Sequence, residues 1–513
     1  MKRITLLLLA VLAIEAANAQ GITDGLIYSS ESQIGTARFN ALSGAFGALG
    51  GDLSGLSINP AGGAIFLASS GTFSIAGNDV DNRSTYFNTR TKSIDTDINL
   101  NQAGGIFVFN FDSENAKLKK FTIAFNYQVE KNYNNELIIK GIGNNSIGDF
   151  FVSQAQGVPL ELLQLQNGES ISSLYSYLGE TEGTSAQNAF LGYQGFIIDP
   201  IDGGNSQNDQ YVSNISPGTF NQEYAYLTEG AKNKYTLNLG AQINNNIFLG
   251  INLNTHSLRY YRNTFLLERN SNAGSFVNEV GFENNLSVRG FGLSAQLGLI
   301  AKIQNNFRVG FSLESPTWYD MFEETTQLLQ TRRVENEESI IERINPQVVN
   351  VFENYSLLTP GSVTASAAYI FGNNGLISFD YSFKDYGSIR FDTYNYSNSY
   401  NNDNYFNSVN NTIKDSLNGV NSVRLGGEYR INQLSLRGGM RYEDSPYKND
   451  DIIGNLSGFS LGLGYNLGSY NIDISYARAK QDRKQQLYSV GLTDSASITT
   501  VTSNIIFTLA FAL

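Results

Sequence analysis

Two neighbouring segments of alternating polarity, 420–431 and 433–443, carry four arginines on one face. A guanidinium group can hold a carboxylate through two parallel hydrogen bonds, so the set could bind a ligand carboxylate. Glu428 and Glu443 share that face, and the alternative is a charge network that fixes one part of the protein to another. The four arginines are Arg424, Arg430, Arg437 and Arg441.

The single histidine, His256, offers little acid/base or metal chemistry. The chain has no cysteine, which excludes disulfides, thiolate nucleophiles, zinc-thiolate sites and cysteine-ligated iron–sulfur clusters. An esterase built on His256 would need a serine and a third, orienting group beside it, and no motif supplies them. Heme would have only this one imidazole available as an iron ligand. We therefore expect a protein that is not an enzyme, has no cofactor, and uses His256 as a hydrogen-bonded structural residue.

The charge balance and two loop motifs exclude other ligands. Acidic residues outnumber basic ones by 47 to 34, whereas a nucleic-acid partner needs a basic footprint. The glycines between 47 and 55 have no Lys-Ser/Thr after them, which favours turns over a phosphate loop. Asp199, Asp202 and Asp209 lack the spacing of an EF-hand, so no metal site is expected.

The N-terminus, residues 1–19, has the pattern of a signal peptide. Lys2 and Arg3 precede an apolar run, and Ala17-Asn18-Ala19 supplies an A-x-A cleavage site. These residues are set aside in predicting the fold. A secreted chain of this size without cysteine favours the envelope of a Gram-negative bacterium.

Apolar and polar residues alternate with period two in segment after segment. In 119–131, for example, Phe121, Ile123 and Phe125 share one face, and Thr122 and Asn126 share the other. Such segments are strands with one apolar and one polar face. The predicted strands are 65–77, 98–111, 119–131, 231–243, 246–261, 286–303, 306–317, 360–371, 374–386, 420–431, 433–443, 457–467, 470–480 and 501–513.

The lengths of the connections distinguish a membrane barrel from a soluble β-sandwich, which is the alternative. Short turns alternate with long connections, as expected when one end of a barrel faces the periplasm and the other faces outside. We therefore predict an all-β fold, a fourteen-stranded antiparallel transmembrane β-barrel in the outer membrane. Its charged residues fall on the lumen face. The main extracellular loops are predicted at 132–230, 262–285, 318–359 and 387–419.

Residues 20–62 do not follow the strand pattern. They are rich in small residues and only weakly apolar, and they end in Asn59-Pro60-Ala61 followed by Gly62. A compact plug inside a crowded lumen suits such residues. The expected organisation is a signal peptide, an N-terminal hatch over 20–62, and a barrel over 63–513.

The sequence resembles the FadL/TodX type of outer-membrane transporters for long-chain fatty acids and other hydrophobic compounds. The resemblance rests on the N-terminal stretch with Asn59, Pro60 and Ala61, on Ser315-Pro316-Thr317-Trp318-Tyr319, and on the regions 360–391 and 421–480. It covers nearly the whole mature chain. It implies a fourteen-stranded barrel plugged by an N-terminal hatch, in agreement with the independent strand count. The four arginines would then bind ligand or tie the barrel wall to the hatch.

The sequence departs from that family in the third strand. In the best-known members a kink there opens a lateral passage into the membrane, but 119–131 contains neither Gly nor Pro. The gate is therefore expected elsewhere, near Gly104-Gly105 on the second strand. The chain ends Phe511-Ala512-Leu513 instead of in the terminal Phe common in outer-membrane proteins, a substitution that the barrel assembly machinery is expected to tolerate.

The loop 132–230 carries apolar residues suited to capturing a hydrophobic ligand, or to packing helices over the barrel mouth. The expected function is passive transport of hydrophobic small molecules such as fatty acids, with outer-membrane lipid and lipopolysaccharide as surroundings. The alternative is a non-transporting surface barrel whose loops bind a partner or matrix. The candidate capture residues are Phe150, Phe151, Leu162 and Leu163.

Overall fold

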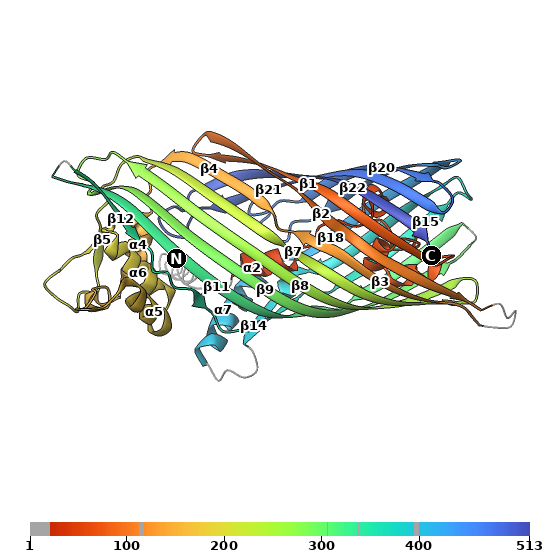
Figure 1. Cartoon of the computed structure of the whole chain (residues 1–513), viewed down its shortest axis with the longest axis horizontal. Coiled ribbons are helices and arrows are strands. Elements are labelled where there is room, and N and C mark those ends of the chain that lie inside the picture. The colour runs from red at the N-terminus through yellow and green to blue at the C-terminus, as the bar shows by residue number, and fades with distance from the viewer. Residues whose placement is uncertain (1–20, 112–116, 305, 337, 394–399) are drawn as a thin grey trace, which may run out of the picture.

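The computed structural model describes residues 21–111, 117–304, 306–336, 338–393 and 400–513. The predicted signal peptide lies outside them. The described residues form a closed antiparallel sheet of fourteen barrel strands (Figure 1). The last, β22 (Ser495–Ala512), pairs with the first, β1 (Ser70–Tyr86), so the sheet closes into a ring. The predicted fold class is confirmed.

Each predicted segment corresponds to one barrel strand, and three of these strands are interrupted. Pro316 separates β10 from β11 and Pro360 separates β14 from β15, because proline cannot donate to a ladder. A short turn, η5 (Tyr386–Ser388), separates β16 from β17. After β1, the barrel strands are β2 (Thr89–Asn110), β3 (Leu118–Asn132), β7 (Phe220–Ile243), β8 (Ile247–Asn270), β9 (Val277–Lys302), β10 (Phe307–Glu314) with β11 (Thr317–Glu335), β14 (Tyr355–Thr359) with β15 (Ser362–Ile370), β16 (Gly375–Asp385) with β17 (Arg390–Thr393), β18 (Gly419–Ile431), β19 (Leu434–Glu443), β20 (Leu456–Asn466), β21 (Tyr470–Gln486) and β22.

The strands run further at the loop end than the apolar alternation indicated. Residues 78–97, which lie between the predicted strands 65–77 and 98–111, form a hairpin in which β1 and β2 meet at Phe87 and Asn88, both with left-handed φ. Likewise, β8 and β9 occupy most of 262–285, and β11 extends well into 318–359. Backbone ladders form whatever the polarity of the side chains, so strand pairing continues where the outward face becomes polar.

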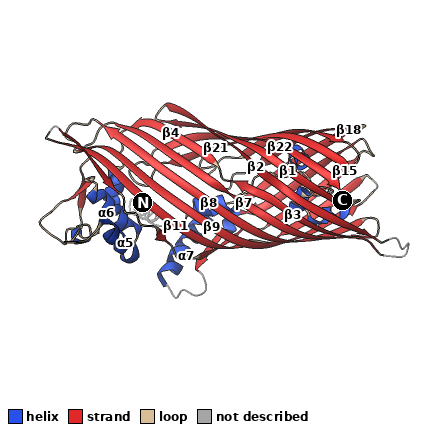
Figure 2. Ribbon diagram, viewed as in Figure 1, coloured by secondary structure: helices blue, strands red, loops and turns tan. Residues whose placement is uncertain are grey.

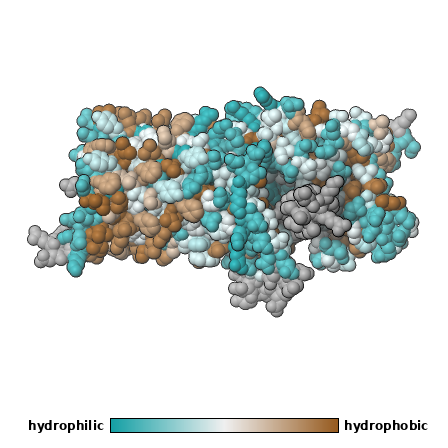
Figure 3. Space-filling view, turned by 180° about the vertical axis from the view of Figure 1, so that it is seen from behind, coloured by the Kyte–Doolittle hydropathy of each residue, from teal (hydrophilic) through white to brown (hydrophobic). Residues whose placement is uncertain are grey.

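Large apolar side chains point outward over the half of the barrel that holds the short turns. On β8, Ile247, Leu249, Ile251 and Leu253 are 40–55% exposed, whereas the alternate residue Asn252 is buried. Seen from behind, hydrophobic residues gather over that end and hydrophilic ones over the other (Figure 3). This belt matches the lipid-facing surface of a membrane barrel.

The loop 132–230 folds into a small domain at the other end of the barrel (Figure 2). Its buried apolar residues form one cluster with the extended ends of β7, β8, β9 and β11 and with 487–498. Among the described residues, no helix combines the length and hydropathy needed to cross a membrane. The elements of this loop are β4 (Asn135–Gly143), α4 (Gly148–Ala155), η4 (Leu160–Leu162), α5 (Ile171–Thr181), α6 (Thr184–Gln194), β5 (Ile198–Pro200) and β6 (Tyr211–Ser213). The remaining elements at this end are β12 (Glu338–Ile344), β13 (Asn350–Val351) and α7 (Tyr400–Ser416).

Glu268, far beyond the apolar belt on β8, fastens this domain. Its carboxyl group accepts hydrogen bonds from Ser146 Oγ at 2.5 Å, from Gln222 Nε2 at 2.8 Å and from the Ile147 amide at 3.1 Å. Burial raises the pKa of Glu268 to about 7. A raised carboxyl pKa means that the docked state binds the proton more tightly, so this stabilisation is fully present below about pH 4.5 and is lost as the pH rises from there through about 7.

We therefore expect the amides of α4 to lose hydrogen-exchange protection between about pH 4.5 and about pH 7, after correction for the intrinsic exchange rate. In Glu268→Gln this pH dependence should disappear, because the amide does not titrate. An unchanged pH dependence in that variant would assign the effect to another group.

Candidate functional site

Residues 21–66 lie inside the barrel and are bonded to its wall. The Ala37 amide donates to Thr508 Oγ1 at 2.7 Å, and the Gly47 amide donates to Asp380 Oδ2 at 3.0 Å. Lys120 Nζ donates to the Phe66 carbonyl at 2.6 Å. This N-terminal segment thus contacts strands on several sides of the lumen. Its helices are α2 (Ile22–Ser29), α3 (Ala37–Ala41), η2 (Ser54–Ser57) and η3 (Pro60–Ile65).

Asn59, Pro60 and Ala61 form a close contact with the wall. Asn59 Oδ1 accepts the Ala61 amide at 3.1 Å and caps η3, with Pro60 at its first position. Asn59 Nδ2 donates to the Gly47 carbonyl at 2.7 Å and to the Leu299 carbonyl at 3.1 Å. The Asn59 side chain therefore connects three parts of the structure: the turn that begins η3, the backbone at Gly47, and strand β9.

Two glycines that face each other on β8 and β9 make room for this turn. A Cβ atom on Gly298 would lie 2.1 Å from Asn59 Oδ1, and one on Gly250 would lie 2.2 Å from the Pro60 carbonyl carbon. Any side chain there would displace the turn. The glycines are required by close approach, since neither has a positive φ.

Glu428 links two of the predicted arginines to the N-terminal segment. It accepts from Arg437 Nε at 2.8 Å, from Arg430 Nε at 2.7 Å and from Arg38 Nε at 2.9 Å. Arg437 also pairs with Asp473. This arrangement favours the charge-network interpretation for Arg430 and Arg437.

The other two arginines differ from this pair. Arg441 lies near Glu443, with 3.9 Å between Nη1 and Oε1, and donates to Gln33 Oε1 at 3.3 Å. It also lines the large cavity described below. Arg424 pairs across the ladder with Asp380 and Arg441, and its buried Nε has no hydrogen-bond partner among the described residues. The structure therefore does not bring the four arginines together as one site.

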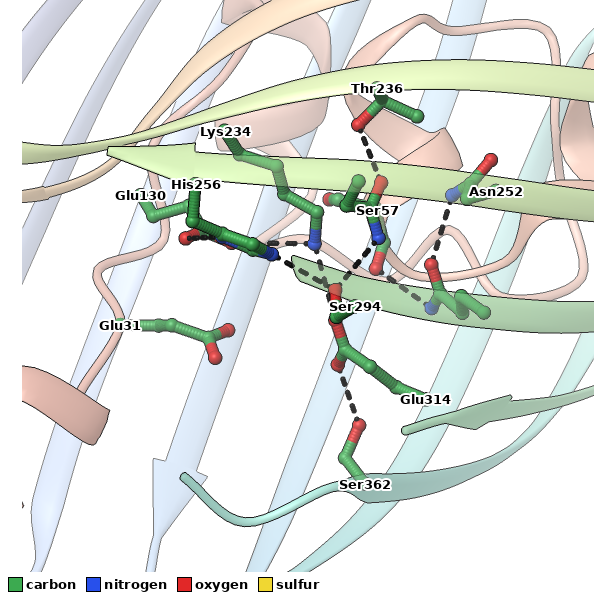
Figure 4. Close-up of polar contacts among 12 residues, drawn as sticks. Glu31, Ser57, Glu130, Lys234, Thr236, Asn252, His256, Ser294, Glu314 and Ser362 are labelled. Atoms are coloured by element: carbon green, nitrogen blue, oxygen red, sulfur yellow. Dashed lines mark hydrogen bonds and ion pairs between the residues drawn. The ribbon is translucent and has the colours of Figure 1, made fainter. Parts of the chain in front are cut away.

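A buried polar cluster lies beside the N-terminal segment (Figure 4). His256 Nδ1 lies 2.9 Å from Glu130 Oε2, and His256 Nε2 lies 2.9 Å from Ser294 Oγ. Lys234 Nζ bridges Glu130 Oε1 at 3.3 Å and Glu314 Oε1 at 3.2 Å. His256 is hydrogen-bonded through both ring nitrogens.

This cluster has the order serine, histidine, carboxylate that a nucleophilic site would use. No sequence motif joins Glu130 and Ser294 to His256, because they come from different strands and lie 126 and 38 residues away from it. However, Lys234 shares Glu130, and Asn254 Nδ2 donates to Ser294 Oγ at 3.2 Å. The large cavity is not lined by any of the three. The contacts therefore favour a structural role in the wall.

A cavity of about 1190 Å³ lies between the N-terminal segment, the barrel wall and the loop domain. Its lining mixes aromatic side chains with cations, carboxylates and amides. Mixed linings of this kind suit an amphipathic ligand. The residues that line it include Leu26, Glu31, Phe150, Tyr260, Arg262, Phe282, Arg441 and Tyr488.

All four predicted capture residues belong to the core of the loop domain or pack against it, and only Phe150 also lines the cavity. Phe150 lines the cavity, with its ring centroid 5.0 Å from that of Tyr488. Phe151 and Leu163 are fully buried in the apolar cluster, and Leu162 packs against it. Arg262 was missed because the alternation that predicted its strand ended at 261. Tyr260 lies inside that predicted strand, and no local pattern distinguished it from its neighbours.

The wall changes its pairing between β2 and β3. The ladder runs from Asn110–Lys120 to Gln102–Gln128, and among the described residues 89–101 of β2 pair only with β1. Beyond this point β4 runs against the β1–β2 hairpin, where Ser84 Oγ donates to the Ile138 carbonyl at 2.7 Å. Gly104 and Gly105, where the gate was expected, are within the ladder, opposite Asn126 and Phe125. The end of the β2–β3 ladder, at Gln102 and Gln128, lies closer than these glycines to the loop end of the barrel. This interruption is called the break between β2 and β3.

Comparisons with known proteins find the fold and little sequence likeness. No family model matches this chain, and no curated protein matches it. A solved structure of a Pseudomonas aeruginosa FadL homologue is similar with TM-score 0.55 and 10% identity, covering 94% of this chain and 99% of that one. The P. putida toluene transporter TodX is similar with TM-score 0.50 and 11% identity, with the same coverage. The fold that the resemblance implied is therefore confirmed.

Proposed function

We propose that this chain is a FadL/TodX-type passive transporter of the outer membrane, and that its substrates are hydrophobic compounds with a polar head, long-chain fatty acids first among them. The observation that carries the proposal is the cavity of about 1190 Å³ above the N-terminal segment. The solved structures with this fold include one described as a toluene transporter and one as a FadL homologue.

The cavity offers each part of such a substrate a matching surface. Phe150, Phe282 and Tyr488 supply an aromatic wall for an alkyl chain. Arg441 is weakly paired, with its carboxylate partner 3.9 Å away, and can take a substrate carboxylate. The substrate would enter past the loop domain, to which Phe150 and the buried Phe151, Leu162 and Leu163 belong.

The N-terminal segment is the hatch of this proposal, because it lies in the lumen below the cavity. Polar contacts hold its upper part: Lys384 Nζ lies 2.6 Å from Glu31 Oε1, and Lys232 Nζ donates to the Ser30 carbonyl at 2.9 Å. Water can replace such contacts when the segment shifts, at lower cost than exposing an apolar core. Release would follow this shift, downward or through the break between β2 and β3.

Replacing Phe150 tests where the ligand lies. Phe150→Ser should weaken binding of a long-chain fatty acid by about tenfold or more, because a buried apolar side chain contributes on the order of 1.5–3 kcal/mol. Binding can be measured by calorimetry in detergent and uptake with a labelled fatty acid. Phe151→Ser is the matched control, since both rings belong to the domain core but only that of Phe150 lines the cavity.

The control should loosen the loop domain, seen as faster proteolysis, with a smaller effect on affinity. If wild type and Phe150→Ser bind the fatty acid with equal affinity, Phe150 contributes to packing of the loop domain and not to ligand binding. Absence of any uptake by the wild type would favour the alternative of a surface barrel that binds a partner through its loops.

A further inference from the structure

The outward face of β8, β9 and β11 is layered from apolar to cationic to polar. Leu253, Phe291, Leu293 and Trp318 form the upper edge of the apolar belt here, each 55–64% exposed. These strands face the viewer in Figure 1. Side chains of this kind suit the acyl chains and interface of a membrane leaflet.

Directly above that edge, two arginines lie side by side. Arg259 and Arg289 are opposite each other in the β8–β9 ladder, and both are exposed. Like charges in directly opposed positions destabilise a sheet. Neither has a carboxylate within 4.0 Å in the described part of the chain, although Glu229, Asp320 and Glu324 occupy diagonal positions on the same face. An external anion between the guanidinium groups would offset their repulsion.

Above the arginines the same face is hollowed. A depression of about 460 Å³ is lined by Tyr261, Asn263, Asn285 and Ser287 and by the carboxylates of Glu229 and Glu324, with Val349 from the loop after β12 at its edge. Hydroxyl and amide groups around an aromatic ring suit a sugar, which offers many hydroxyls and one less polar face.

We propose that this face binds an outer-leaflet glycolipid whose sugar headgroup carries a phosphate. The acyl chains lie on Phe291, Leu293 and Trp318, the phosphate lies between Arg259 and Arg289, and the sugar occupies the depression. The inference rests on the proposed outer-membrane location but on no part of the transport mechanism. Lipid A, the phosphorylated glycolipid portion of lipopolysaccharide, has this chemistry and is the probe.

The test uses Arg259→Gln/Arg289→Gln in the full-length protein. The matched control is Arg83→Gln/Lys92→Gln, because Arg83 and Lys92 are also opposed cations on adjacent strands but already pair with Asp81 at 3.1 Å and 3.4 Å. Lipid A bound to each protein in detergent is measured by native mass spectrometry, beside dephosphorylated lipid A and inorganic phosphate.

Wild type and control should bind lipid A about tenfold or more tightly than the Arg259/Arg289 variant, and more tightly than they bind the dephosphorylated form. Equal binding by all three proteins, equal binding of the dephosphorylated lipid, or displacement of lipid A by dilute inorganic phosphate would each overturn the proposal. Fatty-acid uptake is measured on the same proteins, and we expect it to be unchanged. If the wild type binds lipid A but takes up no fatty acid, the proposed transport function is rejected and the lipid A site is retained.

Discussion

Deleting residues 21–62 should turn a nearly closed barrel into an open channel. Fourteen strands enclose a lumen intermediate between filled barrels of about eight strands and open porins of about 16. In the intact protein that lumen holds the N-terminal segment, including the turn that Asn59 fixes between Gly47 and β9. We expect the deletion variant to conduct ions in planar bilayers about ten times better or more, and to lose selection among solutes.

A point substitution tests whether displacing the N-terminal segment, without deleting it, is enough to open the channel. Gly298→Ala would place a Cβ 2.1 Å from Asn59 Oδ1 and should also raise conductance. Gly427→Ala is its control, because the nearest atom to the new Cβ, the Leu376 carbonyl oxygen, lies 3.8 Å away. Each variant must keep faster gel mobility unheated than boiled, which shows a folded barrel. An intact protein that already conducts like an open porin would contradict both the hatch and the transport mechanism.

The barrel was predictable because its strands repeat one local pattern. Phe121, Ile123 and Phe125 alternate with polar residues whatever lies elsewhere in the chain, and strands adjacent in sequence pair in space. The strand ends were not predictable from apolar residues, since the ladder past Leu253 on β8 continues with polar outward side chains. The turn at Asn59 was visible because capping by an asparagine side chain is local.

The site was less predictable because its contacts join distant parts of the chain. Sequence parity placed Arg437 and Glu428 on one face, but the third partner, Arg38, is 390 residues from Glu428. His256 was expected to be hydrogen-bonded, yet Glu130 and Ser294 become its partners only when three strands align. Phe150 and Phe151 are adjacent in sequence and belong to the same apolar core, and only the fold shows that Phe150 also lines the cavity.

Removing the Glu428 carboxylate should strongly reduce the thermal stability of the folded barrel. Its side chain is fully buried, and in Glu428→Ala the guanidinium groups of Arg38, Arg430 and Arg437 would lose a shared acceptor. Breaking a buried pair costs about 3–5 kcal/mol, and the exposure of Arg430 reduces that arginine's share. We expect the temperature at which the barrel loses its fast gel mobility to fall by roughly 5 °C or more.

Glu443→Ala is the matched control, because Glu443 meets Arg441 only at 3.9 Å and its side chain is 28% exposed. That change should cost about 1 kcal/mol or less. Conductance should rise in Glu428→Ala but not in the control, since Arg38 is the arginine through which the N-terminal segment reaches β18. If Arg430 and Arg437 instead bind the substrate carboxylate, removing their internal competitor would raise fatty-acid affinity. Such an increase, with an unchanged transition temperature, would replace the structural interpretation with the ligand-binding one.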